Sequence, residues 1–65
     1  MARKWFEVEM TFTYANGESG GRLHTVVNST RAVTVQIEAD RNWLSAKGHK
    51  EESLVVKEYG GGRWQ

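Results

Sequence analysis

The sequence predicts a single α+β domain, spanning residues 1–65, with the order ββαβ: a three-stranded antiparallel sheet of strand order 2-1-3 carries one helix on one face. Three observations lead to this prediction. Ten residues near the N-terminus alternate between apolar and polar, 18 residues in the middle have the spacing of a helix without a turn signal, and a strand-like segment lies on either side of those 18. A chain of 65 residues has room for one core.

The first strand is predicted at residues 5–14 (WFEVEMTFTY), where every second residue is apolar. This alternation gives one apolar face and one mostly polar face, and the helix is expected to cover the apolar one. Met10 and Phe12 should therefore be buried beneath the helix, whereas Thr11 and Thr13 should face water. The full apolar set is Phe6, Val8, Met10, Phe12 and Tyr14.

A glycine-rich segment, ANGESGGR, follows the first strand and is predicted to be the flexible tip of a hairpin at residues 15–22. Its Asn16-Gly17 pair tolerates positive φ, as hairpin turns require. The second strand is predicted at residues 22–28, because apolar or β-branched residues again occupy alternate positions there.

Residues 30–47 admit two interpretations. Residues 33–40 (VTVQIEAD) alternate as a strand would, but a helix over the whole stretch places its apolar residues on two adjoining stripes. The first stripe comprises Ala32, Val35, Ala39, Trp43 and Ala46, and the second comprises Val33, Ile37 and Leu44. We favour the helix, with Trp43 in the core, because 18 residues without a turn signal exceed the usual length of a strand. Asn28 or Ser29 can cap its start, and Gly48 can end it.

Residues 48–53 (GHKEES) are predicted to form a polar loop, residues 53–59 (SLVVKEY) the last strand, and residues 60–65 a loose tail. A right-handed crossover through the helix makes the last strand parallel to the second. If the last strand pairs beside the first, those two are antiparallel, and the longest and most apolar strand lies in the middle. This reasoning yields the order 2-1-3.

The composition excludes several classes of site. The chain has no cysteine, so disulfides, thiolate metal sites and cysteine nucleophiles are excluded. Its net charge of +1 is too balanced to predict nucleic-acid or membrane binding from charge alone. No apolar run is long enough to span a membrane and no secretory signal is recognisable, so a cytoplasmic location is expected. A substrate cleft is hard to fit into 65 residues, so we expect no enzymatic activity and no cofactor.

Two patterns resemble chemical sites but have a simpler interpretation. Residues 17–21 (GESGG) match G-x-S-x-G, yet a nucleophile elbow needs a strand before it, a helix after it and a large sheet, whereas these residues lie in the predicted hairpin tip. His24 and His49 could in principle join a carboxylate of the first strand in a metal site. Nothing in their spacing requires this, so two solvent-facing histidines and no metal site are predicted.

The polar face of the first strand is the candidate protein-binding site, and Trp5, Glu7 and Glu9 lie on it in one phase. One interpretation of the carboxylates is pairing across the strands, which is the more usual role of charges on a wet sheet face. The candidate partners are Arg22, His24 and Lys57. The other interpretation is an acidic strip with an aromatic anchor that docks onto a basic protein surface.

Nucleic-acid binding is the alternative function. Exposed aromatic side chains beside basic ones could stack on bases while the cations meet phosphates. The candidate residues, most of them near the two ends of the chain, are Arg3, Lys4, Arg22, Arg63 and Trp64.

Over residues 23–59, the arrangement of a strand, an alanine-bearing helix and a closing strand resembles the small inhibitors of host RNA polymerase made by podophages. The matching positions are Leu23, Val27, Ala32, Ala39, Trp43, Leu54 and Val56. Those inhibitors are helix-on-sheet proteins that bind the polymerase through a charged strand surface. The resemblance implies a phage or mobile-element factor in the host cytoplasm, with RNA polymerase or another nucleic-acid-processing machine as its partner. We therefore favour a non-enzymatic protein-binding module that inhibits a host machine.

Overall fold

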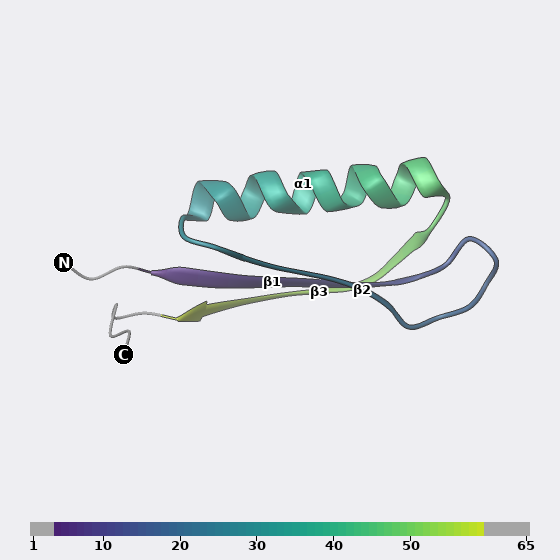
Figure 1. Cartoon of the computed structure of the whole chain (residues 1–65), viewed down its shortest axis with the longest axis horizontal. Coiled ribbons are helices and arrows are strands. Elements are labelled where there is room, and N and C mark those ends of the chain that lie inside the picture. Colours follow the sequence, from purple (N-terminus) through teal and green to yellow (C-terminus); the bar gives the residue numbers. More distant parts are fainter. Residues whose placement is uncertain (1–3, 60–65) are drawn as a thin grey trace.

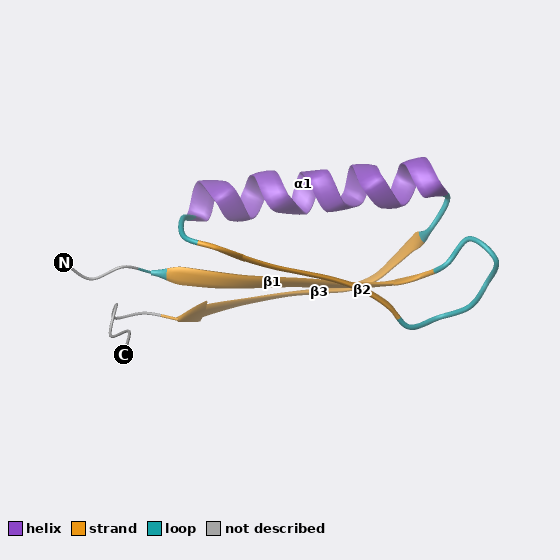
Figure 2. Ribbon diagram, viewed as in Figure 1, coloured by secondary structure: helices purple, strands orange, loops and turns teal. Residues whose placement is uncertain are grey.

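A computed structural model of the chain describes residues 4–59. Its elements are β1 (Trp5–Thr13), β2 (Gly21–Val27), α1 (Thr30–Lys47) and β3 (Lys50–Tyr59). The three strands form one antiparallel sheet in the order β2-β1-β3, and α1 lies along one face of it (Figure 1, Figure 2). The predicted ββαβ fold and its strand order are therefore confirmed.

β1 occupies the middle of the sheet because its alternation supplies the apolar layer of the core. Phe6, Val8, Met10 and Phe12 are all buried, and Leu44 of the helix closes the layer from above. Burial of an apolar strand between two neighbours and a helix removes the most apolar surface from water. The predicted burial of Met10 and Phe12 beneath the helix is confirmed.

α1 begins and ends at local signals. Ser29 has an extended backbone (φ −157°, ψ 156°), and its Oγ accepts a hydrogen bond from the N–H of Ala32 at 3.0 Å. At the other end Gly48 adopts a left-handed conformation (φ 77°), and its N–H donates to the carbonyl of Ser45 at 3.1 Å. The helix predicted for this segment is confirmed, and its alternative, a strand, is wrong. Within residues 4–59 no helix has the length and apolar character to span a membrane.

The helix turns its second predicted stripe, not its first, towards the sheet. Leu44 is buried and Ile37 packs against the core, and the buried side of α1 also includes Asp40, which is only 7% exposed. Val35 and Trp43, from the first stripe, are 58% and 41% exposed, so the predicted place of Trp43 in the core is wrong. A single helix on a sheet buries a narrow face, and two adjoining stripes cannot both lie against it.

The hairpin tip is shorter than predicted. β1 ends at Thr13 and β2 begins at Gly21, so the connection covers residues 14–20 instead of 15–22. Glycine is required at the start of β2 because the ring of Phe12 occupies the space that a side chain would need there. The glycine-rich segment therefore contributes to the core as well as to the turn.

β3 begins three residues earlier than predicted. Residues 50–52, expected within a polar loop at 48–53, continue the strand because β1 is long enough to pair with them. One extra residue, Glu52, interrupts this pairing as a β-bulge. The loose tail predicted at residues 60–65 lies outside the described residues.

Candidate functional site

The face of the sheet opposite α1 is covered by no element within residues 4–59, and we call it the open face (Figure 1). The strand register defines its side chains, because directly paired residues point to the same side. β1 contributes Trp5, Glu7, Glu9, Thr11 and Thr13, β2 contributes Arg22, His24 and Val26, and β3 contributes Lys50, Ser53, Val55, Lys57 and Tyr59. The predicted protein-binding residues Trp5, Glu7 and Glu9 therefore lie together along the middle of this face.

Glu7 is the centre of a hydrogen-bonded group that joins all three strands. Nε2 of His24 lies 2.5 Å from one carboxylate oxygen, and the hydroxyl of Tyr59 donates to the other at 2.7 Å. The hydrogen bond from His24, followed by that from Tyr59, lowers the pKa of Glu7 below its usual value. The same carboxylate raises the pKa of Tyr59 by accepting its hydroxyl proton in a hydrogen bond. Lys57 faces Glu7 across the sheet, and its charge also lowers the pKa of that carboxyl.

The other polar residues of the open face are paired in the same way. Glu9 forms an ion pair with Arg22 at 3.1 Å, and the hydroxyls of Thr11 and Ser53 share a hydrogen bond. Both carboxylates of the candidate site thus have partners on neighbouring strands, which is the geometry expected from cross-strand pairing. Their negative charge is balanced within the sheet, and docking of an acidic strip onto a basic protein surface stays a prediction.

Apolar side chains lie between these pairs. Val26 is 52% exposed, Val55 42% and Tyr59 44%. These three residues were not predicted as part of a site, because β2 and β3 carry apolar residues in both phases of their alternation. The alternation nevertheless indicated that Val26 and Val55 belong to this face, because Val26 shares the phase of His24 and Val55 shares the phase of Lys57.

The residues predicted for nucleic-acid binding do not form one basic surface in the part of the chain that the structure describes. Nζ of Lys4 lies 3.1 Å from a carboxylate oxygen of Glu58, and Arg22 is paired with Glu9. The remaining candidates, Arg3, Arg63 and Trp64, lie outside the described residues.

The two histidines lie on opposite faces of the sheet. His24 belongs to the open face, whereas the ring of His49 stacks on Phe12, on the helix side, with 5.2 Å between centroids. No three potential metal ligands are gathered anywhere in residues 4–59. Residues 17–21 run from the hairpin tip into β2 with no helix directly after them, so this segment lacks the setting of a nucleophile elbow.

The open face therefore offers paired charges, hydroxyls and half-exposed apolar groups, which are the chemical groups found at protein interfaces. No protein-family model matches the chain, and no curated protein or solved structure matches it either.

Proposed function

We propose that the chain is a non-enzymatic protein-binding module that docks its partner on the open face. The observation that carries the proposal is the exposure of Val26, Val55 and Tyr59 on a sheet face left uncovered by residues 4–59. An antiparallel sheet can leave one face in water, but that face is then mostly polar. Exposed apolar side chains on both edge strands of such a face support its use as an interaction surface.

The paired charges give this surface its selectivity. Glu7 and Glu9 are balanced by groups on β2 and β3, so the face presents both signs in a fixed pattern instead of a uniform acidic strip. A partner must complement that pattern, because like charges brought together at an interface cost several kcal/mol. Trp5, which pairs with Tyr59 at one end of the face, supplies the aromatic anchor.

The class of partner follows from the resemblance noted above. The podophage inhibitors bind host RNA polymerase through a charged strand surface, and the open face is the charged strand surface of this chain. We accordingly propose a phage or mobile-element factor that acts in the host cytoplasm on the polymerase or another nucleic-acid-processing machine. Inhibition would result from occlusion, because the bound domain would cover a surface of the host machine and keep the normal ligand of that surface from binding.

Capture of partners from a bacterial lysate, followed by mass spectrometry, tests the proposal with two matched variants. Val55→Lys adds a cation on the β3 side of the open face, opposite Glu9, so the sheet gains a favourable cross-strand pair and should stay folded. Ser45→Lys adds the same charge on the exposed surface of α1. We expect the parent and Ser45→Lys to capture one protein equally well. Val55→Lys should bind it roughly tenfold more weakly, a loss of about 1.4 kcal/mol.

Equal capture by the parent and both variants would exclude the open face as the docking surface. Capture of nucleic acid, with an affinity that falls steeply as salt rises, would favour the alternative function. Reversal of Glu7 and Glu9 to lysine is a less selective test, because both carboxylates have partners inside the sheet and their loss would also perturb the fold.

A further inference from the structure

We propose that Asn16 is a modification site of the folded chain, at which the side-chain amide becomes a carboxylate through a cyclic imide formed with the backbone nitrogen of Gly17. The reaction consumes water, releases ammonia and needs no enzyme. Its site is the hairpin tip (residues 14–20) and not the open face. Three features of the tip support it: the glycine after Asn16, the hydrogen bond that the Asn16 side chain accepts, and the exposure of the segment.

The reaction joins two neighbouring residues, so it is intramolecular and needs no bound partner. The N–H of Gly17 gives its proton to a base, and the nitrogen then forms a bond to Cγ of Asn16. The Cγ–Nδ2 bond breaks, and the side-chain nitrogen takes up a proton and leaves as ammonia. Water opens the cyclic imide that remains. Cleavage between the ring nitrogen and Cγ gives aspartate, whereas cleavage between that nitrogen and the backbone carbonyl carbon gives isoaspartate.

Gly17 leaves the attacking nitrogen accessible. The chain has three asparagines, and only Asn16 is followed by glycine. Gly17 has no Cβ to hinder the approach of its nitrogen to Cγ, and its φ of 95° is a conformation that other residues rarely adopt. A Cβ at this position would meet none of the described atoms within 4 Å. This part of the tip is therefore open to water.

A backbone N–H already contacts the oxygen on which negative charge develops. Oδ1 of Asn16 accepts a hydrogen bond from the N–H of Glu18 at 3.0 Å. When the nitrogen of Gly17 adds to Cγ, the charge forms on this oxygen, and a donor held in place there stabilises it. The same hydrogen bond keeps the side chain of Asn16 turned towards the residues that follow it.

Hydrogen bonds within the tip restrain the reaction. The N–H of Gly17 donates to the carbonyl of Tyr14 at 2.8 Å, and this proton must leave before the nitrogen can attack. The N–H of Tyr14 donates in turn to the carbonyl of Glu18. The N–H of Ala15 donates to Nδ1 of His49. The attack therefore follows a local opening of the tip, and the population of the open form limits its rate.

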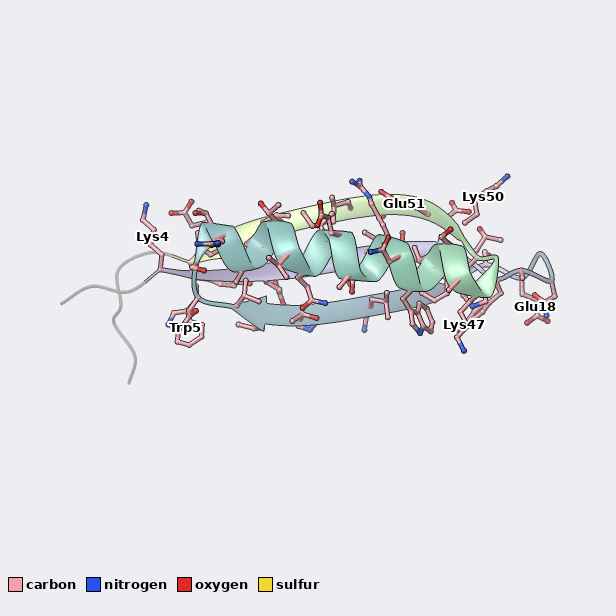
Figure 3. The ribbon with its side chains drawn as sticks, turned by 90° about the horizontal axis from the view of Figure 1, so that it is seen from above. Lys4, Trp5, Glu18, Lys47, Lys50 and Glu51 are labelled. Atoms are coloured by element: carbon pink, nitrogen blue, oxygen red, sulfur yellow. The ribbon has the colours of Figure 1, made fainter. Side chains whose placement is uncertain are left out.

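The tip lies where such an opening disturbs little else. Its residues are all exposed, and the loop projects beyond the end of α1 (Figure 1). Figure 3 shows Glu18 at this end of the molecule, beyond Lys47. Segments with few buried contacts open at low cost.

The other two asparagines lack this setting. The nitrogen after Asn42 belongs to Trp43, within α1, where the backbone is held by the hydrogen bonds of the helix. Asn28 is followed by Ser29, which has a Cβ and is fixed as the N-cap of the helix. These two residues serve as internal controls for Asn16.

The two products affect the tip differently. Aspartate leaves the main chain unchanged, and its carboxylate can accept the hydrogen bond from Glu18 as the amide did. Isoaspartate routes the main chain through Cγ, which adds a carbon before Gly17 and breaks the turn that Gly17 closes with Tyr14. Both products place a new negative charge beside Glu18. The modification therefore makes the tip more acidic, and in the isoaspartate form it also loosens it.

Peptide mapping by mass spectrometry tests the site in the full, folded chain. The chain is incubated at neutral and at mildly alkaline pH, and samples are digested in mild acid at intervals. Asn16 should become a mixture of aspartate and isoaspartate, faster at the higher pH because the attacking nitrogen must lose a proton. Asn28 and Asn42 should keep their amides while half of Asn16 is converted. Asn16→Gln should keep its amide too, because the longer side chain does not form the same ring.

His49→Ala tests the part that the fold plays. Loss of the hydrogen bond from Ala15 should raise the open population of the tip, so Asn16 should be converted roughly two- to tenfold faster, the effect of one hydrogen bond. His49→Gln retains a side-chain oxygen that can accept the bond and should stay closer to the parent rate. Circular dichroism checks that both variants remain folded.

Two results would overturn the proposed site: an Asn16 that keeps its amide throughout, or a loss of the amide at Asn28 or Asn42 at the same rate as at Asn16. Equal rates in the parent and in His49→Ala would overturn the dependence on the opening of the tip.

Discussion

His49 holds the hairpin tip against the end of the helix, since its Nδ1 accepts a hydrogen bond from the backbone N–H of Ala15 at 2.9 Å. The imidazole lies on the ring of Phe12, with the two planes inclined by 16°, and the rings of Tyr14 and Trp43 pack around it. His49 directly follows the glycine that ends α1. One hydrogen bond therefore connects the turn after β1 to the turn after the helix.

Removal of the imidazole should release this contact. His49→Ala leaves the backbone N–H of Ala15 without its acceptor on the ring. We expect the Ala15 amide of this variant to exchange faster with solvent than in the parent, after correction for intrinsic exchange. The local stability lost through the hydrogen bond should be about 0.5–1.5 kcal/mol, the net value of one such bond.

His49→Gln is the matched control for this experiment, because its side-chain oxygen can accept the same hydrogen bond. Protection of the Ala15 amide in this variant should stay closer to that of the parent than in His49→Ala. Equal protection of this amide in the parent and in His49→Ala would mean that a group other than His49 holds the tip.

Alkali should weaken the domain through Tyr59. The pKa of Tyr59 is raised in the folded chain, first of all by the hydrogen bond that it donates to Glu7. Because the folded-state pKa is raised, the protonated hydroxyl of Tyr59 contributes fully to the stability of the fold at neutral pH. That stabilisation is lost as the pH rises through the folded-state pKa, above about 10. Urea denaturation across the alkaline range should show a fall in stability for the parent and for Tyr14→Phe. In Tyr59→Phe the fall in stability should be smaller. An equal fall in the parent and in Tyr59→Phe would show that Tyr59 is not the group responsible.

Glu7 should act at the opposite end of the pH scale. Its pKa is lowered mainly by the hydrogen bond from His24, so its contribution is complete above the ordinary glutamate pKa of about 4.5. That contribution is lost as the pH falls through the folded-state pKa. Glu7→Gln should therefore be less stable than the parent at neutral pH, and the difference should vanish in acid. Glu38→Gln, an exposed control on α1, should match the parent at both ends.

Replacement of Asp40 should stabilise the domain. Gln36 donates to Oδ1 of this buried carboxylate at 2.8 Å, but Oδ2 has no hydrogen-bond partner among residues 4–59. A buried polar atom without a partner costs about 1–3 kcal/mol. Asp40→Leu, beside the buried Leu44, should raise the free energy of unfolding measured in urea by about that amount. Gln36→Leu alone should lower it, because it removes the remaining partner. An unchanged stability in Asp40→Leu would show that Oδ2 carries no such cost.

Gly21 and Phe12 should be energetically coupled. A Cβ at position 21 would collide with the ring of Phe12, so Gly21→Ala should cost about 1–3 kcal/mol as an overpacked core does. Phe12→Ala should cost about 3–5 kcal/mol through the cavity that it leaves. The double variant should cost less than the two single changes together, since the ring and the new methyl group no longer compete for space. Strict additivity in a urea double-mutant cycle would disprove the coupling.

The sequence by itself determined the elements of this domain and their order. α1 begins after Ser29 and ends before Gly48 because both caps act within a single turn of helix. The alternation that buries Met10 and Phe12 is likewise a relation between residues two positions apart. The crossover through the helix makes β3 parallel to β2, and the order 2-1-3 followed once the last strand was placed beside the longest and most apolar strand, β1.

Only the tertiary structure decided which surfaces meet. Both stripes of α1 have the period of a helix, and packing on the sheet placed Leu44 and Asp40 inside while it left Trp43 exposed. His24 was already a candidate partner of the carboxylates from the expected pairing of the first two strands, and the structure places it on Glu7. Tyr59, the other partner of Glu7, lies 52 residues away, a separation over which no periodicity carries information. The period of a segment determines which of its residues share a face. What that face contacts depends on the strand register and on the limited width of the sheet.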